Sequence, residues 1–539
     1  FISTANNTHS AFYSMPARYL QRAIDSEGPS IQSVQKIDGH YDVHAMTPNL
    51  RQVDVVGGFT AASGHHFYTA RDYPKEYWNR VAFISEPTVR VVHNAVIEND
   101  GSGFKEKDGW NLMASSDEWF GPVQAEVGPD GAVWIADWYN FIIQHNVFVP
   151  RQSPSEFILP FNEQPHGQGN AFQSKLRDTN HGRVYRLVYK GANKKPMPKL
   201  SANDMPGLLA ALEHDNMFWR MTAQRLIVES KNKSVASGLF KIIANQKVDE
   251  IGLNSPAVHA LWTLHGLGLL DGSDKAAISA AQKALAHPAA GVRKAAVDVL
   301  PKTADNFDAV EPLLKDQNLN TRLAAFVALI QYPESDKIGA ALYQASLVEE
   351  NEKDSWISKA LLAAAITNEK GYLLAAQKAS LRSKFSDQII AALEMEKYPL
   401  GRRTTFQYSP DVSGKEITIR ATINKDKDRE LQGFIAGQGG ANGGYALYIQ
   451  DGKVVMAVKQ HGMVSKAETR GALPEKFDLE AHLAKDGTIS LVIDGKPAAT
   501  GKAHMLFMTP LEGSLRTGED VEDEDKMGEY EGRFGLQGN

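Results

Sequence analysis

The middle of this chain repeats one structural plan, and this repetition limits the possible folds more than any other feature of the sequence. Between residues 214 and 366, a polar or proline-containing turn repeatedly precedes a segment with apolar residues at i, i+3, i+4 and i+7. That spacing is the period of a helix that buries one face. The segments are HDNMFWRMTAQRLIVE (214–229), SPAVHALWTLHGLG (255–268), HPAAGVRKAAVDVL (287–300), DQNLNTRLAAFVALI (316–330) and KDSWISKALLAAAI (353–366).

The distance between these segments indicates helices that are stacked in pairs. Equivalent positions recur at intervals of roughly 30–40 residues, which is the length of one unit in a helical repeat protein. These positions are Arg220, His259, Arg293, Arg322 and Lys359. We therefore predict an all-α, HEAT-like solenoid over residues 200–397. Trp219, Arg220 and Arg322 resemble the recurrent core aromatic residue and stacking arginine of such units.

The region before the helical part has the period of β-strands. Short alternating or apolar runs, including 81–84, 89–93 and 132–137, are separated by Gly, Pro, Asp and Asn. The tetrapeptide Gly128-Pro129-Asp130-Gly131 is typical of a hairpin turn, because Pro fixes φ at the second turn position and Gly accepts positive φ. Residues 1–190 therefore form a first, all-β domain in our interpretation.

Strand periodicity returns after residue 402. The predicted strands cover 417–423, 443–450, 454–460 and 488–494. Asp451-Gly452 and Asp494-Gly495 are typical of tight hairpin turns, since Gly accepts the left-handed conformation. The glycine-rich run GQGGANGG (437–444) is flanked by strands, so we interpret it as a turn and not as a dinucleotide-binding loop. Residues 402–539 are predicted to form one β-sandwich.

Length and composition exclude several classes of protein. A chain of 539 residues is too long for one hydrophobic core. It has no cysteine, which excludes disulfides, thiolate zinc sites and covalent CxxCH haem attachment within these residues. No segment is apolar over the ~18 residues that a membrane-spanning helix needs. Because the chain begins with Phe and without a signal-peptide pattern, we expect it to be part of a longer precursor.

The negative charge of the chain is concentrated near its end. Residues 519–531 (EDVEDEDKMGEYE) contain eight acidic residues and one lysine, a balance of −7. Since the whole chain carries −6, the remainder carries +1. No basic field is left that would attract nucleic acid.

Two stretches before the helical part carry a resemblance to a known family. They are WFGPVQAEVGPDGAVWIADWYNFIIQHN (119–146) and LRDTNHGRVYRLVYK (176–190), and GGFTAASGHHFYTARDYPKEYWNRVAFISEP (57–87) adds to it. The sequence resembles the large membrane-bound dehydrogenase family of Gram-negative bacteria. This resemblance implies the last blades of a β-propeller similar to sorbosone and glucose dehydrogenases, followed by HEAT repeats. It further implies pyrroloquinoline quinone (PQQ) and Ca²⁺ as cofactors, with haem c confined to a cytochrome c domain or subunit outside this chain.

The resemblance also implies which residues of this chain would belong to a substrate-binding site. Asp137, Trp138, Tyr139, Asn140 and His145 match the DWYN…H element of the family, and Arg183 matches its HGR element. Gly121 and Gln124 stand where the family commonly has Arg and Asp. The family's general-base His and cofactor-binding Arg come mainly from earlier blades, so we expect the catalytic residues to be incomplete here.

The chemistry of sugar or polyol oxidation indicates which residue types could act as the catalytic base. Removal of a hydroxyl proton during hydride transfer needs a base, usually His. His65 and His66 follow Ser63-Gly64 in an expected loop, so we nominate them, with Asp137, as catalytic candidates. Most histidines of this region have an alternative role in bonding backbone groups at blade edges, and His40 with His44 has the spacing of a two-His metal site.

The aromatic and polar candidates have alternatives of their own. Trp119, Trp138 and Tyr139 are candidates for stacking on a sugar, with Asn140, His145 and Arg183 as further substrate-binding residues. The alternative for the tryptophans is to fill the space between blades, which we favour for Trp134 because it lies inside an alternating strand.

The C-terminal region resembles laminin-G-like and concanavalin-A-like jelly-roll sandwiches. The resemblance rests on IAGQGGANGGYALYIQDGKVV (435–455), DLEAHLAKDGTISLVIDGKPAATG (478–501) and GRFGLQGN (532–539). It implies glycan or protein binding, frequently with Ca²⁺. Asp520, Asp523 and Asp525 supply the hard oxygen ligands that Ca²⁺ prefers, although a solvated acidic loop is the alternative.

These observations give two main hypotheses for function. The first is part of an exported, periplasmic or cell-surface protein that oxidises a sugar or polyol through a quinone, with accessory domains for carbohydrate or protein partners. The second is a non-catalytic binding or scaffold protein of the cell envelope. A glycan-processing hydrolase with its catalytic residues outside this chain is a third.

Overall fold

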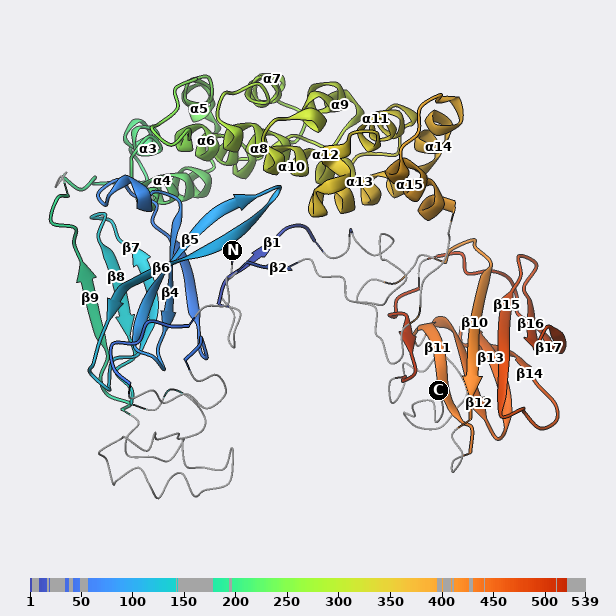
Figure 1. Ribbon diagram of the computed structural model, residues 1–539. Coiled ribbons are helices and arrows are strands. Elements are labelled where there is room, and N and C mark those ends of the chain that lie inside the picture. The colour runs from blue at the N-terminus through green and yellow to red at the C-terminus, as the bar shows by residue number, and fades with distance from the viewer. Residues whose placement is uncertain are drawn as a thin grey trace, which may run out of the picture. The chain divides into compact units, whose positions relative to one another are not determined.

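The computed structural model divides into two compact units. It describes residues 1, 9–16, 19, 34–37, 42–48, 57–141, 143, 178–192, 196–394, 400, 409, 412–425, 430–440, 442–509 and 511–520. One unit takes in the described residues up to 394, and the other takes in those from 400 onward. Strands and helices before residue 394 thus belong to the same unit (Figure 1).

The first unit begins with antiparallel sheets. A four-stranded sheet has the order β3-β4-β5-β6, and a three-stranded sheet has the order β7-β8-β9. Strands β1 and β2 pair separately. Their bounds are β1 (Ala11–Tyr13), β2 (Val34–Lys36), β3 (Ser63–Phe67), β4 (Val81–Glu86), β5 (Val91–Asp100), β6 (Gly103–Ala114), β7 (Pro122–Val127), β8 (Val133–Asp137) and β9 (Arg183–Leu187).

The two larger sheets share a hydrophobic core. Tyr68, Phe83 and Val92 from the first sheet region pack in one cluster with Val133 and Ile135 of the second. The predicted turn at 128–131 joins β7 to β8, and Gly131 has a φ of 73°, as the hairpin prediction requires. The described strands form open sheets, and none of these sheets closes into a barrel.

Thirteen α-helices follow among the described residues. They are α3 (Met205–Ala211), α4 (Met217–Ser230), α5 (Ala236–Ile243), α6 (Ser255–Gly266), α7 (Lys275–Ala284), α8 (Ala290–Val299), α9 (Ala304–Val310), α10 (Leu319–Leu329), α11 (Asp336–Ser346), α12 (Glu349–Lys353), α13 (Ser355–Thr367), α14 (Glu369–Lys378) and α15 (Lys384–Glu394). Each of the five predicted segments contains most of one helix, namely α4, α6, α8, α10 or α13. These five pack in succession and form one row of a solenoid-like array (Figure 1).

The polar turns begin these helices by capping them. Asn216, Asn254 and Asn318 accept hydrogen bonds from backbone N–H groups in the first turns of α4, α6 and α10, and Asp354 does the same for α13. Such caps satisfy donors that have no partner inside the helix. In these four repeats, the polar residue before the apolar stretch is therefore the physical start signal of the helix, whereas α8 begins after Ala289 without a side-chain cap.

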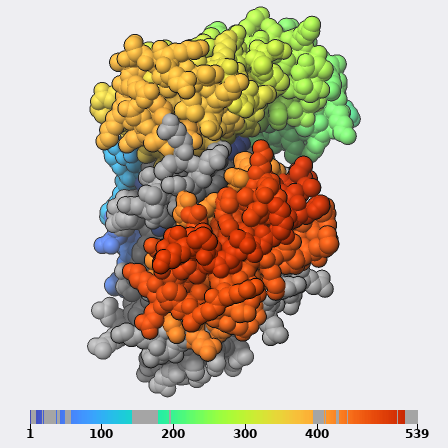
Figure 2. Space-filling view, turned by 90° about the vertical axis from the view of Figure 1, so that its right-hand side faces the viewer, coloured from blue at the N-terminus to red at the C-terminus, as the bar shows by residue number. Residues whose placement is uncertain are grey.

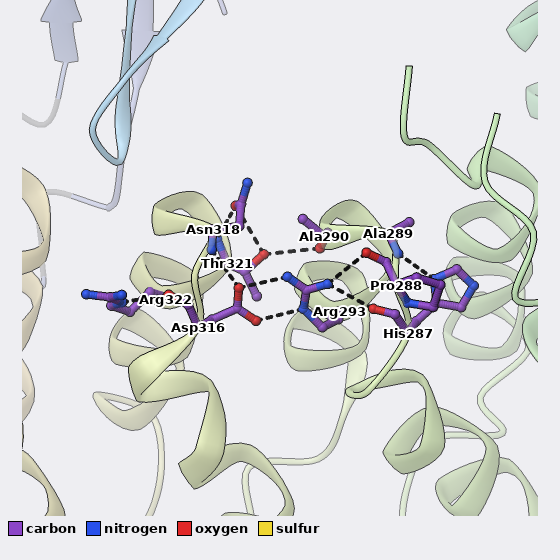
Figure 3. Close-up of polar contacts among 9 residues, drawn as sticks. All are labelled: His287, Pro288, Ala289, Ala290, Arg293, Asp316, Asn318, Thr321 and Arg322. Atoms are coloured by element: carbon purple, nitrogen blue, oxygen red, sulfur yellow. Dashed lines mark hydrogen bonds and ion pairs between the residues drawn. The ribbon is translucent and has the colours of Figure 1, made fainter. Parts of the chain in front are cut away.

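A recurrent arginine fixes the turn that precedes three of the helices. Arg220, Arg293 and Arg322 each donate to the backbone carbonyl of the residue six positions earlier. Arg293 also forms two parallel hydrogen bonds with the Asp316 carboxylate at 2.7 and 2.8 Å, which connects two successive repeats (Figure 3). The sequence predicts that Arg220 and Arg322 are recurrent arginines of the repeat. In the structure, each of them donates a hydrogen bond to the turn before its own helix.

The second unit consists of two antiparallel sheets. They have the orders β10-β15-β16-β17 and β14-β13-β12-β11-β18. Their strands are β10 (Ile417–Asn424), β11 (Gly433–Gly439), β12 (Gly443–Gln450), β13 (Lys453–Gln460), β14 (Met463–Glu468), β15 (Lys476–Leu483), β16 (Thr488–Ile493), β17 (Lys496–Lys502) and β18 (Arg516–Thr517). One hydrophobic cluster includes Ile419 and Leu479 from one sheet and Leu447 and Met456 from the other.

Hairpin geometry in this unit follows the sequence closely. Asp451, Gly452, Asp494 and Gly495 have positive φ, as tight hairpin turns require. The run 437–444 ends β11 and begins β12, which pair with each other, so its interpretation as a strand turn is confirmed. Figure 2 shows one outer face of this unit in orange and red.

None of the described helices combines the length and the hydropathy that crossing a lipid bilayer requires.

Candidate functional site

A large cleft in the described part of the chain lies in the first unit and contains both nominated histidines. Its volume is about 1110 Å³. The sheet and the helical region both contribute, the latter through Met217, Ile251 and Leu253. The remaining lining residues are Phe1, His65, His66, Phe67, Thr69, Lys75, Glu76, Trp78, Asn79, Arg80, Ile97, Glu98, Asn99 and Phe104.

An irregularity in β3 brings both histidines to the cleft. The register between β3 and β4 shifts between Ser63 and His66, so consecutive side chains no longer alternate regularly. Gly64 has a φ of 67°, and a Cβ atom there would lie 2.8 Å from Oε1 of Gln124. The Ser63 hydroxyl donates to the Val123 carbonyl at 2.9 Å. Ser63 and Gly64 thus hold β3 close to β7. The shifted register after them lets both His65 and His66 line the cleft.

Both histidines favour the neutral imidazole. Burial lowers the pKa of His65 to about 4 and also lowers the pKa of His66. Nε2 of His65 lies 2.8 Å from the Ser10 hydroxyl, which fixes the ring. Near neutral pH the cleft therefore presents uncharged hydrogen-bonding rings at this position.

The cationic side chains at the cleft are already paired. Nη2 of Arg80 lies 2.6 Å from Glu98, and Nζ of Lys75 lies 3.3 Å from Glu250. Trp78 donates from its indole N–H to the Tyr73 carbonyl at 2.7 Å. The cleft thus combines aromatic surface with polar groups whose charges are largely compensated.

Asp137, the third catalytic candidate, is a structural anchor at the end of β8. Its side chain is fully buried and accepts hydrogen bonds from the backbone N–H groups of Gly121 and Tyr139 at 2.8 and 2.9 Å. Its second oxygen accepts from Nε of Arg183 at 2.5 Å. Asp137 lies outside the residues that line the cleft. Its acceptor positions are occupied by groups that hold β7, β8 and β9 together.

The other residues of the two motifs gather around this anchor. Arg183 also pairs with Asp117 at 2.6 Å, and its guanidinium lies 4.5 Å from the centre of the Tyr139 ring. Trp119 stacks on Tyr139 at 5.4 Å. Asn140 is buried and donates to the Asp178 carbonyl at 2.9 Å. The structure thus brings these motif residues together, but none of them lines the cleft that contains His65 and His66.

Trp134 and Trp138, which flank the end of β8, are both exposed. Trp134 is 39% exposed, with Arg186 over its ring, so the expectation that it fills the space between blades is wrong. Its position in β8 alternates with buried residues, which places it on the outer face. Trp138 is 42% exposed and does not line the cleft.

The metal candidates are only partly described. Asp520 is buried and lies 3.5 Å from Arg516. Asp523 and Asp525 lie outside the described residues, as do His145 and His40. His44 bonds to Asp108 at 2.5 Å.

Sequence reasoning missed most of the cleft. Glu98 and Phe104 come from segments without a chemical motif, and Met217 is over a hundred residues away from them in sequence. The run RDYPKEYWNR (71–80) belongs to the family resemblance but carries no catalytic pattern, and it contributes several lining residues.

Comparisons with known proteins give little further information. The family model described as "Domain of unknown function (DUF7133)" matches residues 1–191. No curated protein matches the chain. Among solved structures, domains LG4-5 of the mouse laminin alpha1 chain share 17% identity over 26% of this chain, with a TM-score of 0.22. The chain spans 36% of that laminin structure. The complex of CpcE and CpcF of phycocyanin lyase from Nostoc sp. PCC7120 shares 24% identity over 36% of this chain and 68% of its own, with a TM-score of 0.19.

Proposed function

We propose that this chain is a binding module and that the cleft at His65 and His66 takes an uncharged, polar ligand, best represented by a saccharide. The cleft itself carries this proposal. Its volume of about 1110 Å³ is ample for an oligosaccharide, since ligand pockets usually measure ~300–1,000 Å³. Aromatic side chains offer the apolar faces of sugar rings a surface, and neutral histidines donate to or accept from hydroxyl groups.

The pairing of the charges argues for an uncharged ligand over an anion. An anionic ligand would have to compete with Glu98 for Arg80 and with Glu250 for Lys75. A saccharide does not have to displace either glutamate, because its neutral hydroxyl groups can donate to the carboxylates and accept from the cations while the ion pairs stay intact. The selectivity we propose is thus for shape and hydroxyl pattern.

The quinone cofactor implied by the family resemblance does not fit the described residues of this cleft. The carboxylates of pyrroloquinoline quinone need cations or Ca²⁺ to hold them, and both Lys75 and Arg80 are engaged. Asp137, nominated for chemistry, is occupied by backbone donors and Arg183. We therefore derive no redox step from these residues.

A titration of the full chain with a panel of oligosaccharides tests the proposal. Trp78→Ala and His66→Ala should each weaken binding about tenfold, which corresponds to ~1.4 kcal/mol and to the usual value of one aromatic contact. Trp138→Ala is the matched control, because Trp138 is exposed but lies outside the cleft. Loss of binding in Trp138→Ala alone would move the site to the 137–140 motif.

One observation favours a second candidate, a sugar or polyol dehydrogenase of which this chain is a part. His66 lines the cleft, and burial favours its neutral imidazole, which is the form that a general base must have. In this proposal residues outside the described part of the cleft hold the quinone, and the protein, exported to the periplasm or cell surface, passes electrons to a cytochrome c partner. Dye-linked oxidation of sugars by the longer polypeptide, supplied with PQQ and Ca²⁺, tests it, and absence of turnover in a folded, glycan-binding protein would contradict it.

A further inference from the structure

Two histidines and a glutamate converge inside the first unit, away from the lining of the cleft. His9 precedes β1, His93 lies in β5 and Glu106 lies in β6. Their potential ligand atoms all lie within 4.8 Å of one another. All three side chains are at most 2% exposed. Three segments that are distant in sequence thus direct their polar ends to one buried point.

We propose that His9, His93 and Glu106 bind a Zn²⁺ ion that fastens the segment before β1 to strands β5 and β6. Two imidazoles with one carboxylate form a donor set that Zn²⁺ commonly takes in proteins. Nothing in the sequence signals this site, because the spacings between its members match no motif.

The geometry is close to what a zinc ion needs. At bond lengths of ~2.0–2.2 Å, the ligand atoms of a tetrahedral zinc lie roughly 3.3 Å apart. Nε2 of His93 lies 3.5 Å from Oε1 of Glu106, and Nε2 of His9 lies 2.7 Å from the same oxygen. The two imidazole rings meet at an interplanar angle of 87°, so they approach the common point from different directions. Small rotations of the side chains would bring all three atoms to ligand distance.

The electrostatics of the cluster also favour a cation. The side chain of Glu106 is fully buried, and a buried carboxylate is stable only when a charge or several donors compensate it. A divalent ion between the three side chains would place positive charge beside this buried carboxylate.

The proposed ion has a structural consequence for the cleft. Ser10 follows His9 directly and bonds to Nε2 of His65, one of the lining histidines. Holding His9 therefore also holds the partner that orients His65. The metal site stands independently of the proposed saccharide, since its ligands are not lining residues.

Metal analysis of the full chain, purified without a histidine tag from zinc-supplemented medium, tests the proposal. We expect about one Zn²⁺ per chain. His93→Gln and Glu106→Gln should lower the bound zinc at least tenfold, since even indirect contacts to a metal change affinity by about 10–100-fold. His44→Gln is the matched control, because His44 pairs with Asp108 outside the cluster and should keep the zinc. Zinc that persists in both ligand variants would overturn the proposal.

A second measurement uses only wild-type protein, so it tests the proposal even if the ligand variants do not fold. Wild-type protein treated with a chelator should lose thermal stability and regain it with one equivalent of Zn²⁺, and Co²⁺ in its place should give the visible absorption of a tetrahedral site. If the chelator changes nothing and Co²⁺ gives no such absorption, the cluster is only a hydrogen-bonded group and the proposal is wrong.

Discussion

Arg293 and Asp316 form a two-pronged ion pair that connects successive repeats of the helical array. The guanidinium donates from Nε and Nη2 to the two carboxylate oxygens, and its Nη1 donates to the carbonyls of His287 and Pro288 (Figure 3). Asp316 in turn accepts from the N–H of Asn318, which begins the next helix. One pair thus fixes two turns at once, and the array is held by these links as well as by its apolar faces.

Replacing Asp316 by Asn should destabilise the helical array by about 2 kcal/mol, because the largely buried guanidinium loses its counter-charge. The side chains of Arg293 and Asp316 are only 16% and 5% exposed. Urea denaturation followed by far-ultraviolet circular dichroism measures the change. The exposed pair Lys294–Asp298 provides the control, since Lys294→Met should cost less than ~0.5 kcal/mol. Equal effects of the two substitutions would contradict a special role for the Arg293 pair.

The helices could be predicted from sequence because their signals are local. A cap such as Asn318 and an apolar period lie within one turn or two of each other, so a short window contains the whole signal. The same holds for the Asp-Gly hairpins of the second unit. Where a capping residue or a glycine turn stands in the sequence, the predicted end of the helix or strand lies within a few residues of the observed end.

The sites could not be predicted because their signals are not local. His9 and Glu106 meet although 97 positions separate them. The DWYN and HGR motifs identified residues that do gather, but the backbone donors that occupy Asp137 are invisible in sequence. The sequence could not place Trp134, because alternation alone does not say which face of a strand is covered.

Asp137→Asn should destabilise the first unit by about 2–4 kcal/mol, since the amide cannot replace the buried charge that Arg183 bonds. Thermal unfolding of the full chain measures the loss. Glu98→Gln is the matched control, because Glu98 forms ion pairs with exposed partners and should cost less than ~1 kcal/mol. A stable Asp137→Asn variant that has lost ligand binding or turnover would instead return Asp137 to a functional role.

His259 should make the helical array sensitive to acid. Burial lowers its pKa in the folded chain to about 4, against 6.5 when unfolded. Between these values only the unfolded chain takes up the proton, so stability is complete above pH 6.5 and falls as the pH drops toward 4. At ~1.4 kcal/mol per pH unit, the loss at pH 5 is about 2 kcal/mol. Denaturation of wild type and His259→Gln at pH 7 and pH 5 should show a smaller loss in the variant, and identical pH dependence in both would refute the assignment.

Gly501→Ala should destabilise the second unit by about 2 kcal/mol, through a close backbone approach between edge strands of its two sheets. Gly501 lies in β17 and Lys466 in β14, and a Cβ atom on Gly501 would lie only 2.3 Å from the Lys466 carbonyl oxygen. Because that atom belongs to the backbone, the strands themselves must separate. Gly443→Ala is the control, since its nearest neighbour would be 3.4 Å away. Hydrogen exchange should rise in β14 and β17 for Gly501→Ala only, and unchanged protection there would mean that the two edges are not held together at this point.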